Sequence, residues 1–423
     1  MSVQKVEKQR AQVKLVFGGA REPGFDLGCV MEELGLEFHA FATSAGVVVM
    51  KALMTSEEEW LAGAKGSHGT EINRHGSNPG SVCIGGQKVA MKRRRLRTRE
   101  GGEVRLSSYD AFHRNSDRSR AVYERLISGI SCRDYAQTVE AVVDGYGVSK
   151  SVVNREMLQA TAKDLTKLCE KDLGGLDILV LMIDGIRVGR TLQVVALGVE
   201  ISGKKHVLGF REGSTENARV CLDLLHDLKK RNLQMSEPML VVIDGSKALR
   251  SAVEEFFGDG VEVQRCHQHK LQNVKSYLPK AYHGEYERKI RAAWGMTGYD
   301  DARIALRDVV RELGRVNVQA AESLEEGFEE TLTLHRLGLP EILRKSFSTT
   351  NLIESPFSFV RKVLRNVKRW QTNTNQAQRW IAAAALQMQG RFRKIRGYRS
   401  MSVLRSALEA EAEKKDSKQN KAA

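Results

Sequence analysis

Proline, cysteine and aromatic residues are scarce in this chain. Its 423 residues include 6 prolines and 6 cysteines, and 6% of them are aromatic. So few prolines exclude a collagen-like or polyproline chain, and 41% hydrophobic residues are too many for a disordered one. The cysteines lie tens of residues apart, so we expect no disulfide framework and a reducing compartment, the cytoplasm.

Long apolar runs and acidic residues are also in short supply. The longest apolar stretches, residues 40–50 and 380–388, fall short of the ~20 residues that span a bilayer, so no membrane segment is expected. Neither follows a basic N-terminal region of the kind found in secretory signals. Lys and Arg number 67 against 52 Asp and Glu, a net charge of +15 at pH 7. This excess predicts a polyanionic partner, with nucleic acid as the leading candidate.

Length and local composition predict several domains. At roughly 150 residues per domain, a chain of this length holds about three. Residues 1–86 are expected to form an N-terminal helical region and a linker. The helix is predicted over 55–62, and the flexible linker, rich in Gly, Ser, Asn and His, over 63–86.

Residues 87–108 are strongly basic. Apolar residues recur among the cations on both sides of Gly101-Gly102, which predicts a basic β-ribbon folded at this glycine pair. Eight cations against two acids exceed what protection of an edge strand requires, so contact with nucleic acid is expected. The alternative is a solvated edge strand. The candidate contacts are Lys92, Arg93, Arg94, Arg95 and Arg97.

Residues 109–172 are predicted to be helical and to contain a helix-turn-helix-like DNA-binding domain. The pattern is a helix over 135–143, a Gly-bearing turn at Tyr146-Gly147 and a second helix that opens in Ser and Lys. An ordinary helical hairpin is the alternative. The candidate DNA contacts on the second helix are Lys150, Asn154 and Arg155.

From residue 173 the pattern changes to buried strands. Five apolar runs predict strands, at residues 177–183, 191–199, 206–210, 239–243 and 261–265. With helical segments after the third and fourth runs, they predict an α/β domain over 173–278, a mixed sheet covered by helices. Residues 279–345 carry no strand signal and predict an all-helical insertion. Residues 346–408 would complete the domain and add basic helices, and 409–423 would be a charged, frayed tail.

Three acidic residues are candidates for chemistry. Asp184 and Asp244 each follow an apolar run ending in Ile and precede a Gly, which suits the crevice where open sheets bind ligands. Glu354 opens a helix that has almost no other acid. Each has a structural alternative: a hairpin turn at Asp184, a helix N-cap at Asp244, and a capping box from Asn351 to Glu354. If Pro356 is the first helical residue, Glu354 lies just outside the helix.

Converging carboxylates call for a cation. Two ionised carboxylates about 4 Å apart repel by roughly 4 kcal/mol at an effective dielectric near 20, and a divalent ion removes this cost. Hard oxygen ligands with open positions suit Mg²⁺ or Mn²⁺. A pair of ions about 3.5–4 Å apart can activate the attacking oxygen and stabilise the leaving oxygen of a phosphodiester. The three acids therefore predict metal-dependent phosphoryl transfer with two ions.

Cys266 and His269 have the spacing Cys-x2-His. With no second Cys or His pair nearby in the sequence, a structural zinc site is disfavoured. A buried thiol and imidazole packed near the acidic residues are expected instead, and the remaining cysteines are expected in the core.

The segment after Glu354 contains no further acid until Glu409. Twelve cations in this interval differ from the mixed signs of a solvated face, so contact with the DNA backbone is expected. Trp370, Trp380 and Tyr398 would stack on bases or pack internally. The cations are Arg361, Lys362, Arg365, Lys368, Arg369, Arg379, Arg391, Arg393, Lys394, Arg396, Arg399 and Arg405.

Together these motifs resemble those of bacterial Mutator-type insertion-sequence transposases. The match spans about residues 87–398, with 60 residues between the two Asp and 110 between Asp244 and Glu354. Its specific pieces are Ile183-Asp184-Gly185, Ile243-Asp244-Gly245, Gln264-Arg265-Cys266-x-x-His269-Lys270 and Thr350-Asn351-x-Ile353-Glu354-Ser355. The resemblance implies a DDE transposase with an RNase H-like catalytic domain and a metal-binding triad of Asp184, Asp244 and Glu354. Cys266 and His269 match the family's Cys-x2-His signature.

The resemblance also implies the partners. They are the terminal inverted repeats of the element and target DNA, bound by a homodimer or higher oligomer on paired ends, at the bacterial nucleoid. The sequence departs from the family pattern at Ala248, where relatives often have Gly, and at Pro356, just after the catalytic Glu. Two alternatives stay open: a nuclease or resolvase on the same fold that only hydrolyses, and a DNA-binding regulator with an inactive core.

Overall fold

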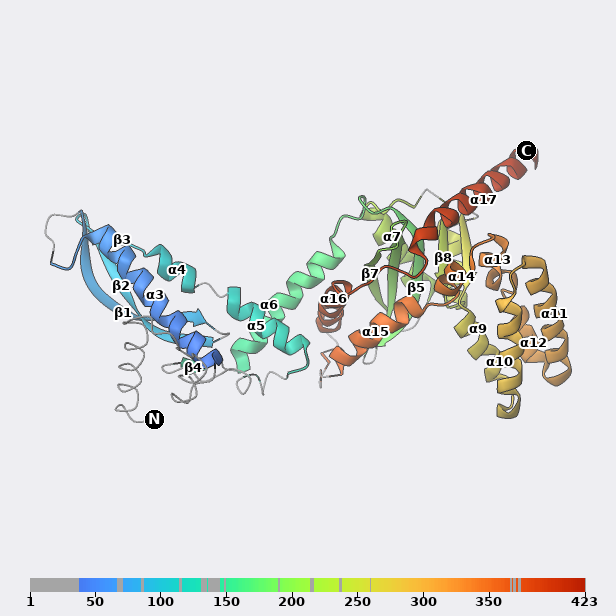
Figure 1. Ribbon diagram of the computed structural model, residues 1–423, viewed down its shortest axis with the longest axis horizontal. Coiled ribbons are helices and arrows are strands. Elements are labelled where there is room, and N and C mark those ends of the chain that lie inside the picture. Colours follow the sequence, from blue (N-terminus) through green and yellow to red (C-terminus); the bar gives the residue numbers. More distant parts are fainter. Residues whose placement is uncertain are drawn as a thin grey trace, which may run out of the picture. The chain divides into compact units, whose positions relative to one another are not determined.

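The computed structural model divides into two compact units, Met1–Ala160 and Thr161–Ala423 (Figure 1). Each unit is described by itself. The residues described are 38–66, 71–84, 87–113, 116–130, 135, 145–147, 150–188, 191–213, 217–235, 238–258, 260–365, 367, 370–371 and 374–422. None of the helices in these ranges is long and apolar enough to cross a lipid bilayer.

The first unit is built on a long antiparallel hairpin. Strands β1 (Ile72–Ile84) and β2 (Gln87–Thr98) pair along most of their length, and helix α3 (Phe38–Ala62) packs against them. The two-residue β3 (Glu103–Val104) and the short β4 (Gly145–Gly147) both pair with β2. The core between helix and ribbon contains Met54, Val82, Val89, Met91 and Leu96. Burial of these side chains ties the ribbon to the helix.

Three expectations for this region need correction. Residues 72–84 form strand β1, so the flexible linker predicted over 63–86 is wrong there. The main partner of β2 is therefore β1, and the predicted fold at Gly101-Gly102 pairs only the two residues of β3. The helix predicted over 55–62 begins at Phe38.

Helices follow the ribbon, namely α4 (Ser107–His113), α5 (Ser116–Ile127) and α6 (Lys150–Cys169). The second helix of the predicted helix-turn-helix corresponds to the start of α6. The expected turn at Tyr146-Gly147 lies in β4, and the expected first helix falls outside the described residues except for Tyr135. The helix-turn-helix therefore stays a prediction.

The second unit contains a five-stranded mixed sheet, as predicted. The strands are β5 (Ile178–Val188), β6 (Thr191–Glu200), β7 (Lys205–Gly213), β8 (Met239–Ile243) and β9 (Val261–Arg265). They lie in the order β7-β6-β5-β8-β9. The first three are antiparallel, whereas β5, β8 and β9 run parallel.

Helices cover the sheet (Figure 1). Helices α7 (Ala218–Lys230) and α8 (Lys247–Phe257) bury Leu224 and Val253 in one core cluster with Ile183 and Ile243 of the sheet. Residues alternate between the faces of a strand, so Asp184 belongs to the face opposite Ile183. Helix α15 (Asn351–Leu364) packs against β5.

Residues 279–345 contain helices and no strand, as predicted. After α9 (His267–Ser276) come α10 (Lys280–Gly295), α11 (Tyr299–Val316), α12 (Val318–Glu325), the 3₁₀ turn η2 (Glu329–Thr331), α13 (Thr333–Arg336) and α14 (Glu341–Phe347). They have a core of their own, in which Ile290, Trp294, Leu306 and Leu324 are buried.

The C-terminal segment comprises α16 (Gln376–Gln389), the turn η3 (Tyr398–Ser400) and α17 (Met401–Ala422). The expectation of a frayed tail is wrong for its first part. Glu411 pairs with Arg336 at 3.0 Å and Lys415 pairs with Glu262 at 2.8 Å. These ion pairs hold α17 against α13 and β9.

Candidate active site at the ends of β5, β8 and β9

The parallel pairing of three strands places three candidate residues in a row. Ile183 pairs with Ile243, and Ile243 pairs with Arg265. The residues that follow these three in the chain are Asp184 in β5, Asp244 just after β8 and Cys266 just after β9. Because neighbouring strands lie about 4.8 Å apart, these residues are neighbours at one edge of the sheet. The register thus joins positions that are 60 and 22 residues apart in the sequence.

The local structure decides the alternatives for the two aspartates. Asp184 lies within β5, where it pairs with Val195 of β6, so it is not in a hairpin turn. Its Oδ1 accepts a hydrogen bond from the Gly185 amide at 2.8 Å. Asp244 follows β8 and accepts from the Ser246 amide at 2.8 Å, but the N-cap of α8 is Ser246. Neither aspartate therefore serves the structural role that its sequence context allowed.

Glu354 lies in the first turn of α15. The helix begins at Asn351 with Thr350 as its N-cap and includes Pro356, so the predicted Ser355 cap and the capping box from Asn351 are both wrong. Tertiary packing overrides the usual preference of Pro for the first helical position. Oε1 of Glu354 accepts a hydrogen bond from the Thr350 hydroxyl at 2.9 Å.

Electrostatics connects the three carboxylates. Asp184 is only 5% exposed. Burial raises the pKa of its carboxyl to about 7, and the charges of Asp244 and Glu354 add to the increase, while His269 opposes it. Asp244 and Glu354 are thus near enough to Asp184 for their charges to influence its ionisation. Nowhere in the described ranges, however, do three His, Cys, Asp or Glu side chains form a ready-made metal-binding group.

Cys266 and His269 lie beside Glu354. The Cys266 thiol is fully buried, and the Thr350 amide donates to its Sγ at 3.4 Å. Nε2 of His269 is 3.8 Å from Oε1 of Glu354. The hydrogen bond to Cys266 is the largest cause that raises the pKa of His269 to about 9. Burial opposes this increase, and the nearby acids add to it. The expected packing near the acidic residues is confirmed for the buried thiol, whereas the imidazole is only partly buried, with 29% of its side chain exposed.

Sequence reasoning missed three polar residues around this edge. Thr350 is buried between Cys266 and Glu354. Lys270 is fully buried, and its Nζ donates to the Ser323 and Glu326 carbonyls at 2.6 Å each. The Arg265 guanidinium, 5% exposed, donates to the Glu326 carbonyl at 3.0 Å. All three stand inside quoted motifs, but only long-range contacts show what they bind.

A comparison with protein families matches residues 40–394 to the model of the family described as Transposase, Mutator family. The chain belongs to this family. The transposase for insertion sequence element IS6120 of Mycolicibacterium smegmatis is 30% identical over 243 residues, 56% of this chain and 73% of that protein. The transposase for IS256 in transposon Tn4001 of Staphylococcus aureus is 28% identical over 302 residues, 69% and 75% of the two chains.

A longer match covers most of the chain. The transposase for ISRM5 of Rhizobium meliloti is 24% identical over 370 residues, 85% of this chain and 90% of that protein. The family resemblance inferred from the motifs is therefore confirmed, and the chain is a Mutator-family transposase.

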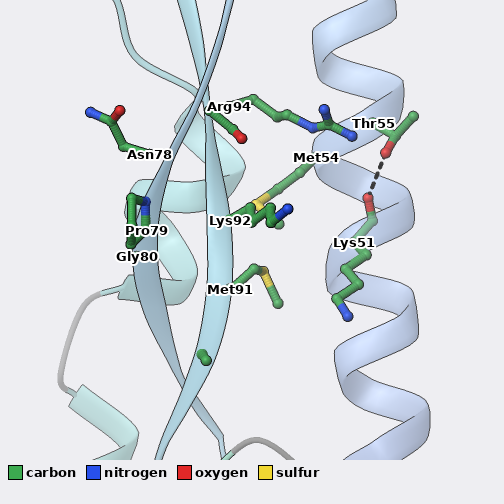
Figure 2. A pocket seen from close by; sticks show the side chains of 11 residues that line it. Lys51, Met54, Thr55, Asn78, Pro79, Gly80, Met91, Lys92 and Arg94 are labelled. Carbon is green, nitrogen blue, oxygen red and sulfur yellow. Dashed lines mark hydrogen bonds between the residues drawn. The ribbon is translucent and has the colours of Figure 1, made fainter.

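In this transposase, the basic ribbon and α3 line a pocket together. Figure 2 shows Lys92 and Arg94 extending from β2 toward α3, where Lys51 and Met54 also line a pocket of about 770 Å³. Lys92 is exposed, but Arg93 pairs with Glu103, and Arg94 lies 3.5 Å from Glu58. Arg95 and Arg97 are partly buried. Of the five predicted contacts, Lys92 is thus the most available.

The other predicted DNA contacts differ in availability. Along α6 and α15 the side chains are exposed and have no ion-pair partner among the described residues: Lys150, Asn154, Arg155, Arg361, Lys362 and Arg365. Lys368 and Arg369 lie outside those residues. Arg379 and Arg405 bind other residues of the chain instead. Arg379 is buried and donates to Asn375 and Thr161, and Arg405 pairs with Asp177.

Proposed function

We propose that this transposase cuts DNA at the ends of an insertion sequence and joins the resulting 3′-hydroxyl to target DNA. Asp184, Asp244 and Glu354 form the catalytic triad of this proposal. The observation that carries it is the strand register, which makes Asp184 and Asp244 neighbours at the sheet edge. Helix α15, which bears Glu354, packs on the same strand, β5.

The sheet supports an RNase H-like catalytic core. Three antiparallel strands in consecutive order are followed by two strands parallel to the first, in the order β7-β6-β5-β8-β9. The helical residues 279–345 interrupt the chain between β9 and α15. A mixed sheet with a helical insertion therefore supports the proposal of the RNase H-like fold that the motif resemblance implies.

The donor chemistry of the triad fits Mg²⁺ or Mn²⁺, with two ions in the proposal. Three carboxylates supply the hard oxygen ligands that these ions prefer. The raised pKa of Asp184 reflects its burial and, to a smaller extent, the negative charges of Asp244 and Glu354, and a bound cation lowers both costs. When bound, the ions would supply activation of the attacking oxygen and stabilisation of the leaving oxygen. The chain's own part is to hold the carboxylates at the sheet edge and to exclude water around Asp184.

Exposed cations would hold the DNA. In the proposal Arg361, Lys362 and Arg365 extend along α15 from the Glu354 turn, so the helix contacts the phosphates next to the scissile bond. The ribbon and the start of α6, with its helix-turn-helix-like segment, would bind the terminal inverted repeats. The protein would act at the bacterial nucleoid as a homodimer or higher oligomer on paired ends.

The direct test is Asp244→Asn. This change removes the negative charge and keeps the shape of the side chain, so we expect cleavage and joining of the element's terminal repeats with Mg²⁺ to fall below detection while DNA binding persists. Normal cleavage and joining by the variant would refute the triad. Offering the wild type a pre-cleaved end with a free 3′-hydroxyl separates transposition from hydrolysis, because a nuclease would not insert it.

A further inference from the structure

Thr350 occupies an N-cap position without capping. A Thr at this position usually accepts a hydrogen bond from a first-turn amide of the helix. Thr350 makes no such side-chain bond. Its buried hydroxyl instead donates to Oε1 of Glu354 at 2.9 Å. The start of α15 therefore gives up a capping bond and gains a bond to the proposed catalytic carboxylate.

Thr350 also contacts the Cys-x2-His motif. Its amide donates to Cys266 Sγ at 3.4 Å, and its hydroxyl oxygen lies 3.4 Å from Nδ1 of His269. Nε2 of His269 is 3.8 Å from Oε1 of Glu354, which is too long for a hydrogen bond. The hydrogen bonds of Thr350 thus connect Cys266, at the end of β9, and His269, at the start of α9, to the carboxylate of Glu354.

The two oxygens of Glu354 differ as a result. Oε1 is held by Thr350, whereas Oε2 has no hydrogen-bond partner in the described parts of the chain. A partner that fixes one carboxylate oxygen orients the other, and loss of such a partner typically weakens metal binding or activity by about 10–100-fold. We infer that Thr350 is a positioning residue whose hydroxyl orients Glu354 so that Oε2 faces the divalent ions. The inference rests on the proposed function, in which Glu354 is a metal ligand.

The test compares variants that differ in one hydroxyl. Thr350→Val keeps the shape of the side chain but removes the donor, and Thr350→Ser keeps the donor. Mn²⁺ binding to the full-length protein without DNA is measured by calorimetry. We expect about 10–100-fold weaker binding for Thr350→Val and near wild-type binding for Thr350→Ser. Thr349→Val is the matched control, because among the described residues the hydroxyl of Thr349 binds just the Asn351 amide, from which it accepts at 3.4 Å.

Two further readouts separate positioning from folding. The affinity for DNA in chelator and the melting temperature in chelator should stay within about twofold and a few degrees of wild type for Thr350→Val. The Mn²⁺ concentration for half-maximal cleavage should rise by the same factor as the dissociation constant. If Thr350→Val does not fold, Thr350→Ala against Thr350→Ser supplies the same comparison.

The outcomes distinguish the inference from the proposed function. Wild-type Mn²⁺ binding by Thr350→Val, together with loss of binding in Glu354→Gln, would overturn the inference and leave the triad in place. Equal losses in Thr350→Val and Thr350→Ser would also overturn it, because the hydroxyl would then not be the cause. Full binding and cleavage by Glu354→Gln would refute the proposed function, and the inference with it.

Discussion

Replacement of Asp184 by Asn should stabilise the metal-free protein. Asn keeps an oxygen that can accept from the Gly185 amide but removes a buried charge. The pKa of Asp184 is raised from 3.8 to about 7, so the folded state holds a proton that the unfolded state loses between these values. Folding stability therefore falls as pH rises through this window and levels off above it. The Asp184 carboxyl therefore lowers the free energy of unfolding by roughly 2 kcal/mol at pH 5 and roughly 4 kcal/mol at pH 8.

The assay is urea unfolding of wild type and Asp184→Asn in chelator at these two pH values. We expect the variant to be the more stable protein, with a larger advantage at pH 8. Addition of Mn²⁺ should stabilise the wild type and leave the variant unchanged, because the cation binds the folded state through the carboxylates. Asp223→Asn, at an exposed position of α7, is the control. A variant that is no more stable than wild type at pH 8 would refute the reasoning about Asp184.

Four further predictions concern packing and DNA binding. Gly327→Ala should lower the free energy of unfolding by about 1–3 kcal/mol, because φ is +67° and a Cβ would lie 2.5 Å from Cζ of Arg265. Gly284→Ala, in open space within α10, should raise it by about 0.5–1 kcal/mol, and denaturant unfolding measures both. Lys270→Met should cost about 1–3 kcal/mol in the same assay, since the Ser323 carbonyl loses its Lys270 donor while the Glu326 carbonyl keeps the one from Arg265. In binding assays at several salt concentrations, Arg361→Ala with Lys362→Ala should reduce the salt slope by about 2, and an unchanged slope would contradict a phosphate contact.

The sheet of the second unit could be predicted from the sequence because its strands are buried on both faces. A run such as Ile178 to Ile183 is apolar without interruption, and all six residues are buried. The same reasoning located Asp184 and Asp244 but not the full length of β5. That strand continues to Val188 because β6 pairs with it beyond the point where β8 ends.

The ribbon was harder to predict because few of the residues in β1 are both apolar and buried. β1 contains Gly76, Pro79, Gly80 and several polar residues, which are typical of a linker. Only Val82 and Cys83 of this strand are buried. Its strand conformation comes from the long register with β2 and from α3, and neither is visible as local periodicity.

The start of α15 shows a different limit of sequence reasoning. Local rules suggested a cap at Asn351 or Ser355, with Pro356 as the first helical residue in the second case. The helix instead begins at Asn351 after the N-cap Thr350, whose amide donates to Cys266, 84 positions earlier. A local motif can predict which residues lie near a site. The contacts that orient those residues, such as that of Thr350 with Cys266, depend on how distant strands pair.

Buried Arg265 contacts both the helical residues 279–345 and the turn after Asp244. The Arg265 side chain lies between two glycines. A Cβ on Gly245, the residue after Asp244, would be 2.8 Å from its Nε, and one on Gly327 would be 2.5 Å from its Cζ. Arg265 also donates to the Glu326 carbonyl and lies 3.2 Å from Glu330. Removing the insertion would take away the Glu326 carbonyl and the Glu330 carboxylate that bind this guanidinium. The turn that presents Asp244 therefore depends on the docked insertion, and the two cannot be treated as independent domains.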